Sequence, residues 1–304
     1  MTKELSIIIP VYNSESCLMQ TVERVVVALD RIKVTYEIIL IDDGSSDQSW
    51  SVIKQLKLKK PFIVGVKLRK NFGQHNALLC GVNLADANYI VTIDDDLEQN
   101  PDDIEKLYSL IKTENFDLVY AVPINIKKNL LRSFVTKVYK KISRIENKKA
   151  GDGSAFRIFS KSLRNNLLDH DGPLFFLDEI ALWYTDNIGF ESVHFQKSLK
   201  KSSGYSFGSL FTLSLRVMSL SSTMPLKIVR VLGIYISVIS IFLASYFILR
   251  KIIFKVPSGY TSIIVAVLFS SGIITFSLGI IGEYLANLIS LTNKKPSYSI
   301  KEKI

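Results

Sequence analysis

Two kinds of pattern alternate over the first 120 residues, and this alternation constrains the fold more than any other feature of the chain. Short runs rich in β-branched residues are separated by amphipathic stretches of helical length. The expected strands are 5–10, 36–42, 62–68, 89–94 and 116–121, and the expected helices are 15–30, 47–57, 74–86 and 101–112. A spacing of about 25 to 30 residues is typical of βα units, so we expect an α/β fold with a mostly parallel, buried sheet.

Acidic residues cluster where two of these strands end. The clusters are Asp42, Asp43 and Asp47, and Asp94, Asp95, Asp96 and Glu98. A helix N-cap accounts for part of the first cluster. It does not explain why acids crowd a second strand end, where their repulsion is costly unless a cation is bound. Ligands of open α/β sheets bind beyond the carboxyl ends of the strands, so the pattern indicates a nucleotide site with Mg²⁺ or Mn²⁺.

The segment after the first strand carries no glycine-rich phosphate loop. It contains Pro10, Tyr12 and Asn13, with neither a Walker lysine motif nor a GxGxxG motif. The sequence therefore excludes P-loop and dinucleotide-binding proteins. An Asp-x-Asp pair is a weak signal alone, but its position after the fourth strand, with Asp43 after the second, is a strong combination.

The C-terminal third is much more apolar than the rest. Residues 231–249 and 256–282 contain no charged residue, and the whole chain has a mean hydropathy of +0.24. A bilayer core needs roughly 20 apolar residues as helix, so we expect two spans. The expected organisation is a catalytic domain at 1–208, an interfacial helix at 209–227, a membrane hairpin at 228–291 with spans at about 229–250 and 261–285, and a tail at 292–304.

Charge indicates the expected partners and location. The net charge is +10, and basic residues flank the expected hairpin, which favours a cytoplasmic catalytic domain on a multi-pass protein of the inner membrane. The basic stretch 128–145 predicts an amphipathic helix, either solvated or lying on the membrane surface. No aromatic-interleaved basic module is present, so nucleic acid is not an expected partner.

Several segments together resemble a known family. They are IIIPVYNSE, IDDGSSD, RKNFGQHNAL, TIDDDLEQNP, GSAFRIFSK, SSGYSF, MPLK and LGIIGEYL. Over about residues 4 to 296 the chain resembles family 2 glycosyltransferases of the GT-A fold. Within them it is similar to the polyprenyl-phosphate glycosyltransferases, the group that includes dolichyl-phosphate mannose synthase and bactoprenol glucosyltransferases.

The resemblance implies roles for individual residues. Those implied to bind the nucleotide sugar are Pro10, Tyr12, Asn13, Glu15, Asp43, Lys70, Asn71, Gly73, Asp94 and Asp95. Those implied to hold Mg²⁺ or Mn²⁺ are Asp94, Asp96 and Glu98. Those implied to meet the acceptor phosphate are Arg132, Lys137 and Arg157, and Asp96 and Arg157 are the expected catalytic residues. The chain departs from the family in having Glu98 for glutamine, Lys70 for arginine, and Pro123 and Ile124 in place of basic residues.

The activity that the resemblance implies is transfer of a single sugar, with inversion, from a UDP-sugar to undecaprenyl phosphate. The donor we expect is UDP-glucose, with UDP-GlcNAc or a modified aminosugar as alternatives, and the product would modify a cell-surface polysaccharide such as O-antigen. A homo-oligomer such as a tetramer is also implied. A processive synthase usually carries Gln-x-x-Arg-Trp, and neither Trp50 nor Trp183 lies in one. A third hypothesis is a non-catalytic membrane scaffold with a degenerate glycosyltransferase domain.

Overall fold

The computed structural model describes residues 3–124, 154–169, 177–196, 260–292 and 296–304, together with isolated positions between 231 and 253. The chain divides into two units. The first comprises Met1–Gly204 and Pro296–Ile304, and the second comprises Tyr205–Lys295. The C-terminal residues therefore belong to the first unit, although the whole second unit precedes them in the sequence.

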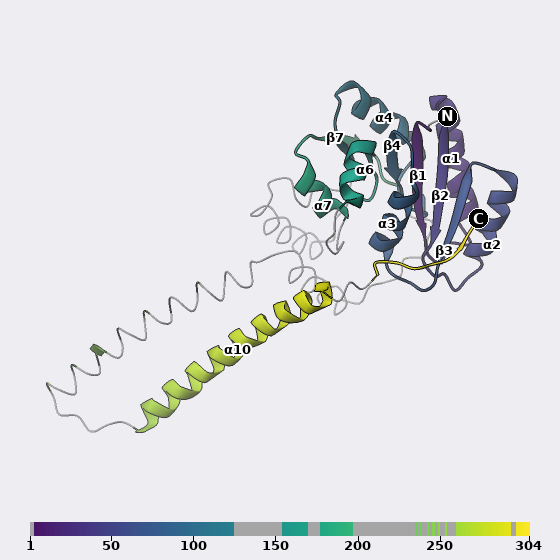
Figure 1. Ribbon diagram of the computed structural model, residues 1–304. Coiled ribbons are helices and arrows are strands. Elements are labelled where there is room, and N and C mark those ends of the chain that lie inside the picture. The colour runs from purple at the N-terminus through teal and green to yellow at the C-terminus, as the bar shows by residue number, and fades with distance from the viewer. Residues whose placement is uncertain are drawn as a thin grey trace. The chain divides into compact units, whose positions relative to one another are not determined.

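The first unit is built on an eight-stranded sheet with the order β7-β5-β6-β4-β1-β2-β3-β8. Figure 1 labels five of these strands, β7, β4, β1, β2 and β3. Its strands are β1 (Leu5–Val11), β2 (Tyr36–Asp42), β3 (Ile63–Leu68), β4 (Tyr89–Thr92), β5 (Leu118–Pro123), β6 (Arg157–Ser160), β7 (Ile188–Val193) and β8 (Ile300–Lys303). The four strands β3, β2, β1 and β4 are parallel, whereas β6 and β8 run antiparallel to their neighbours. The expected mostly parallel α/β sheet is confirmed, but the sequence analysis did not foresee β8.

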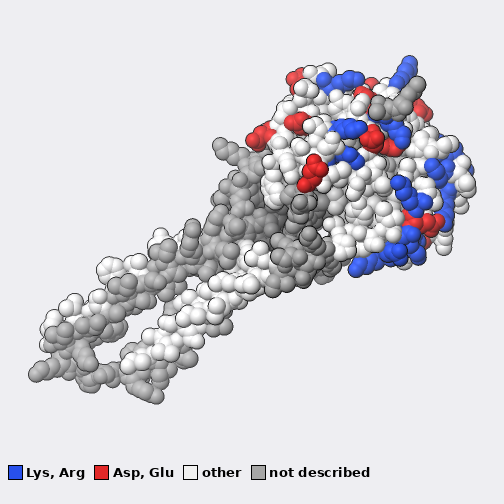
Figure 2. All heavy atoms as spheres, in the orientation of Figure 1, with Lys and Arg blue, Asp and Glu red and all other residues white. Residues whose placement is uncertain are grey.

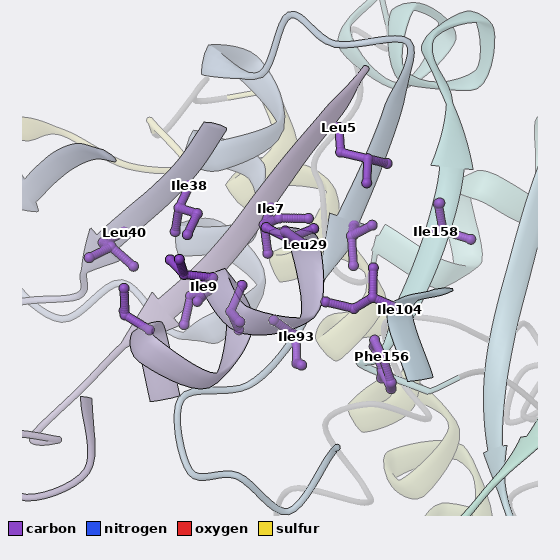
Figure 3. Close-up of a cluster of buried hydrophobic side chains, with 14 of the residues drawn as sticks. Leu5, Ile7, Ile9, Leu29, Ile38, Leu40, Ile93, Ile104, Phe156 and Ile158 are labelled. Atoms are coloured by element: carbon purple, nitrogen blue, oxygen red, sulfur yellow. The ribbon is translucent and has the colours of Figure 1, made fainter. Parts of the chain in front are cut away.

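Helices cover both faces of this sheet. They are α1 (Leu18–Ile32), α2 (Ser49–Lys59), α3 (Gln74–Leu84), the 3₁₀ turn η1 (Pro101–Asp103), α4 (Ile104–Thr113), α6 (Lys161–Leu168) and α7 (Leu177–Tyr184). One buried cluster joins the sheet to α1, α2 and α4 (Figure 3), and a second joins it to α3, α6 and α7. In β1, Ile7 and Ile9 belong to the first cluster and Ile8 to the second, because side chains alternate between the faces of a strand. Burial on both faces explains the continuous apolar run of β1.

The reversed direction of β6 matters for the site. Thr92, the last residue of β4, pairs with Arg157, the first residue of β6. Parallel strands end at one edge of a sheet, and an antiparallel strand begins there. Arg157 therefore lies at the same sheet edge as the acidic residues that follow β2 and β4.

The second unit contains α10 (Tyr260–Thr292). Apolar side chains along this helix, such as Ile263, Phe276 and Leu288, are exposed. Among the residues that the structure describes, no helix combines the length and hydropathy needed for a membrane crossing. The span predicted at about 261–285 overlaps α10, and the span predicted at about 229–250 falls where only isolated positions are described. The predicted hairpin, which was inferred from charge-free runs of sequence alone, is thus not supported, and the predicted helix at 209–227 lies outside the described residues.

Candidate active site

The loops after β1 and β2 are fastened to each other. The amide of Asn13 donates to Ser45 Oγ at 3.0 Å, and Asn13 Oδ1 accepts from the amide of Ser46 at 2.9 Å. Glu15 Oε2 likewise accepts from the amide of Gln48 at 2.8 Å. These reciprocal bonds fix the two loops without help from a ligand. Tyr12, in the loop after β1, is 45% exposed.

Asp95 ties the loop after β4 to the loop after β1. Its Oδ2 accepts from the amide of Tyr12 at 3.3 Å and from the hydroxyl of Ser14, and its carbonyl oxygen accepts from Thr21 Oγ1 at 2.9 Å. The residue is only 5% exposed. The sequence analysis expected Asp95 to bind the nucleotide sugar. In the structure its carboxylate bonds to Tyr12 and Ser14, and its role in binding the nucleotide sugar stays a prediction.

Asp43 holds the loop that follows β3. Its two carboxylate oxygens accept from the amides of Phe72 and Gly73 at 2.7 and 2.8 Å. Gly73 has a φ of 92°, a conformation that side-chain-bearing residues rarely adopt. Burial raises the pKa of Asp43, and the two amide hydrogen bonds oppose that rise. Lys70, Asn71 and Gly73 thus lie in one loop beside Asp43, and their common role in binding the donor stays a prediction.

Asp94 is held by two glutamines. Its Oδ1 accepts from Gln74 Nε2 at 2.7 Å and its Oδ2 from Gln99 Nε2 at 2.8 Å. Burial, followed by the charges of Asp96 and Asp95, raises the pKa of Asp94 to about 7. Three successive carboxylates in a half-buried turn repel one another, and that repulsion is what a bound cation would relieve.

The turn that carries these acids is strained. Leu97 has a φ of 59° and is buried, and the amide of Glu98 donates to Asp96 Oδ1 at 3.0 Å. A non-glycine residue in the left-handed region costs free energy and is found preferentially at functional sites. Among the described residues, no three His, Cys, Asp or Glu side chains converge on a point that could hold a metal ion. The assignment of Asp94, Asp96 and Glu98 to a metal ion stays a prediction.

Arg157 is buried beside this turn. Its side chain is 2% exposed, Nε donates to Thr92 Oγ1 at 3.2 Å, and Nη1 forms an ion pair with Asp178 of α7. The charge of Arg157 also opposes the rise in the Asp94 pKa. The sequence analysis expected this guanidinium to contact an acceptor phosphate. The structure gives it two protein partners, and its contact with the acceptor phosphate stays a prediction.

The structure brings together most of the expected donor and metal residues at one sheet edge. Pro10 is buried within β1, next to the loop that carries Tyr12. Arg132 and Lys137 lie outside the described residues. Sequence reasoning missed Ser14, Gln74, Gln99 and Asp178. Gln99 directly follows the acidic cluster in sequence, and Gln74 directly follows Gly73, so their positions could have indicated a role in the site. Asp178 gives no such indication, because acids are common in the first turn of a helix.

The fold is that of the GT-A class of glycosyltransferases. The chain is similar in fold to glucosyl-3-phosphoglycerate synthase from Mycobacterium tuberculosis, crystallised with Mn²⁺, UDP and phosphoglyceric acid; the TM-score is 0.51 at 18% identity, covering 71% of this chain and 76% of that one. Residues 6–171 match the model of glycosyl transferase family 2, and the chain belongs to this family.

Two relatives match the chain over nearly its whole length. An uncharacterized glycosyltransferase of Synechocystis sp. is 31% identical, over 99% of this chain and 96% of the relative. The undecaprenyl-phosphate 4-deoxy-4-formamido-L-arabinose transferase of Proteus mirabilis is 27% identical, over 98% of this chain and 93% of the relative. Both matches therefore include the second unit, Tyr205–Lys295, as well as the first, which we call the catalytic unit.

Proposed function

We propose that this glycosyltransferase transfers one sugar from a UDP-sugar to undecaprenyl phosphate. The observation that carries the proposal is the full-length similarity to an enzyme named for transfer to undecaprenyl phosphate, together with the acidic edge described above. A similarity confined to the catalytic unit would support sugar transfer alone. A similarity that extends through the apolar C-terminal third also supports a lipid acceptor.

The donor is proposed to bind along the edge formed by the ends of β1, β2 and β4. Tyr12 lies exposed at the rim, and Asp43 with the loop from Lys70 to Gly73 forms the neighbouring wall. UDP-glucose is the donor expected from the sequence. The name of the Proteus relative favours a modified aminosugar as the second candidate.

The acidic turn fits Mg²⁺ or Mn²⁺. Asp94 and Asp96 supply hard oxygen ligands, and these ions are commonly held by one or two carboxylates together with substrate phosphates. Burial, and then the charges of Asp96 and Asp95, raise the pKa of Asp94, and a bound cation would offset both effects. When bound, such an ion would stabilise the charge of the departing diphosphate. Glu98, which is exposed, is the proposed third carboxylate.

The acceptor explains why the site needs no general base. A phosphate monoester is an oxyanion near neutral pH, because its second pKa is about 6. We therefore propose direct attack of a phosphate oxygen on the anomeric carbon, with inversion and loss of UDP. Arg132 and Lys137 are the proposed contacts of the acceptor phosphate. Arg157, held beneath the acidic turn, contributes its positive charge to the site and helps to orient both anions.

The proposed acceptor is a membrane lipid, so we also propose that the enzyme acts at the inner membrane with its catalytic unit in the cytoplasm. The exposed apolar side chains of α10 are the proposed lipid-associated surface. A homo-oligomer, expected from the sequence, is part of the same proposal. The lipid-linked sugar is proposed to be used in the modification of a cell-surface polysaccharide.

A transfer assay tests the proposal. Full-length protein is incubated with undecaprenyl phosphate, Mg²⁺ or Mn²⁺, and a panel of labelled donors: UDP-glucose, UDP-GlcNAc and a UDP-linked 4-formamido pentose. We expect one donor to yield an organic-extractable labelled lipid, and EDTA to stop its formation. Transfer to water or to a soluble polysaccharide instead of the lipid would contradict the proposed acceptor. Absence of both transfer and nucleotide binding would favour a non-catalytic scaffold.

A further inference from the structure

The last residues of the chain form a strand of the catalytic unit. In the pairing of β8 with β3, Val66 lies opposite Lys303 and Leu68 opposite Ile300. Beyond β8, Gly65 and Ile304 exchange backbone hydrogen bonds of 3.1 and 2.9 Å. The segment is therefore paired with β3 from Gly65 to Leu68.

Residues of β3 and of the C-terminal segment make specific contacts where the two strands pair. A Cβ atom on Gly65 would lie 2.8 Å from Ile304 Cγ1 and 2.6 Å from Ile53 Cγ2. Glycine inside a strand often marks such a close approach of another chain segment. Tyr298 provides a second anchor, because its hydroxyl accepts from Asn83 Nδ2 of α3 at 2.9 Å.

Glu302 provides a third anchor, on an otherwise basic edge. Its carboxylate accepts from Trp50 Nε1 at 3.2 Å and lies 2.8 Å from Lys54 Nζ. The hydrogen bond from Lys54 is the main cause of the lowered pKa of Glu302. Lys and Arg side chains gather along the edge that carries α2 (Figure 2). An acid on β8 therefore meets complementary charge where it docks.

The docked strand reaches the start of the loop that follows β3. The amide of Arg69 donates to the carbonyl oxygen of Ser299 at 2.9 Å. Three residues further along, the amides of Phe72 and Gly73 are bound by Asp43. The loop is thus held at its start by the C-terminal segment and at its end by Asp43.

We propose that residues 298–304 are a positioning element of the donor site, which holds the 69–73 loop in the conformation that Asp43 requires. Only the claim that this loop contacts the nucleotide rests on the proposed function. Without the C-terminal segment, β3 would become the sheet edge and Arg69 would lose its carbonyl partner. The loop would then sample conformations in which the bonds from Phe72 and Gly73 to Asp43 are open, and nucleotide affinity would fall with the competent fraction.

A purely protective role makes a different prediction. An added strand can simply cover the edge of a sheet. In that case its loss would lower the thermal stability of the whole unit without a specific effect on the 69–73 loop. Local opening can be measured separately from global stability by amide hydrogen exchange.

The first test compares the full chain with a chain ending at Lys295, both without nucleotide. We expect the amides of Phe72 and Gly73 to exchange roughly ten-fold faster in the shortened chain, while the α4 amides are unchanged. Equal exchange of the loop amides in both proteins, or a uniform increase that includes α4, would overturn the proposal. This measurement does not depend on what the site binds.

Point variants provide the test if the shortened chain fails to fold. Glu302→Ala removes the contacts to Trp50 and Lys54, and Lys301→Ala on the same strand is the control, because Lys301 is exposed. We expect faster loop exchange and about ten-fold weaker UDP binding in Glu302→Ala only. A synthetic peptide of residues 296–304 should restore both properties to the shortened chain. If the full chain binds no UDP but loop exchange responds as expected, the proposed function fails and the positioning role stands.

Discussion

Arg157 and Asp178 form a buried ion pair between β6 and α7, although they are 21 positions apart in the sequence. The guanidinium is 2% exposed and the carboxylate 32% exposed, and Asp178 is the carboxylate in direct contact with the arginine, whose charge also interacts with that of Asp94. Thr92 supplies only a neutral acceptor to Arg157 Nε. The pair thereby connects a helix of the outer layer to the strand that borders the acidic turn.

Removing the Asp178 carboxylate should destabilise the catalytic unit. Asp178→Ala leaves a buried guanidinium without its counter-charge, for which we expect a loss of about 3 kcal/mol in the free energy of unfolding. Asp178→Asn keeps an acceptor and should cost about 1–2 kcal/mol. Denaturant unfolding measures both values. Glu105→Ala, an exposed acid on α4, is the control, and an Asp178→Ala protein as stable as this control would refute the assigned dependence.

Asp96→Asn should abolish sugar transfer and leave the fold intact. The substitution removes the charge but keeps Oδ1, which accepts from the amide of Glu98. Loss of electrostatic stabilisation of this kind typically lowers turnover by about 10²–10³-fold or more. The transfer assay measures activity, and circular dichroism with thermal unfolding checks the fold. Glu98→Gln, at an exposed position of the same turn, should lose less activity; full activity in Asp96→Asn would exclude the metal and diphosphate role.

Gly81→Ala should destabilise the protein, the opposite of the usual effect of this change within a helix. A Cβ atom at position 81 of α3 would collide with Ile8 Cγ2 of β1. Overpacking of this kind costs about 1–3 kcal/mol, whereas glycine to alanine in an open helix position gains up to about 1 kcal/mol. Unfolding of the double variant Gly81→Ala/Ile8→Val should recover part of the loss. Additive effects of the two changes would argue against a direct collision.

His75 should make folding stability depend on pH in mildly acidic solution. Burial, and to a lesser degree the charge of Arg157, lowers the pKa of His75 to about 4, whereas an unfolded histidine has a pKa of about 6.5. Between these values the unfolded chain binds more protons, so this contribution is complete above about pH 6.5 and is lost as the pH falls toward 4. His75→Asn should show a flatter stability profile across this window. Parallel profiles for the two proteins would contradict the assignment.

The sequence was sufficient for the parallel half of the sheet and for the position of the site. The strands β1 to β5 and the helices α1 to α4 occur where hydrophobic periodicity placed them, within a few residues. The reason is that β1 and β2 are buried on both faces and each helix has one apolar stripe, so local pattern and final environment agree. Because the ends of parallel strands share one edge, the acids after β2 and β4 could be assigned to one site from order alone.

Contacts between distant segments could not be predicted from the sequence. The pattern of residues 300–303 is short and charged, and only pairing with β3 makes it a strand. Nothing local distinguishes Asp95, whose carboxylate turns inward to Ser14, from Asp94, which two glutamines hold in the site.

Local chemistry, meaning which residues are apolar, acidic or able to turn, thus determined the class of fold and the acidic edge, and the resemblance of whole motifs to a known family implied sugar transfer. Only the tertiary structure decided which acid faces the site, that Arg157 is paired with Asp178, and that the C-terminal residues close the sheet beside β3. These choices depend on the direction in which each strand enters the sheet. That direction is set by packing and backbone pairing across the whole unit, because no single segment contains both partners of a contact.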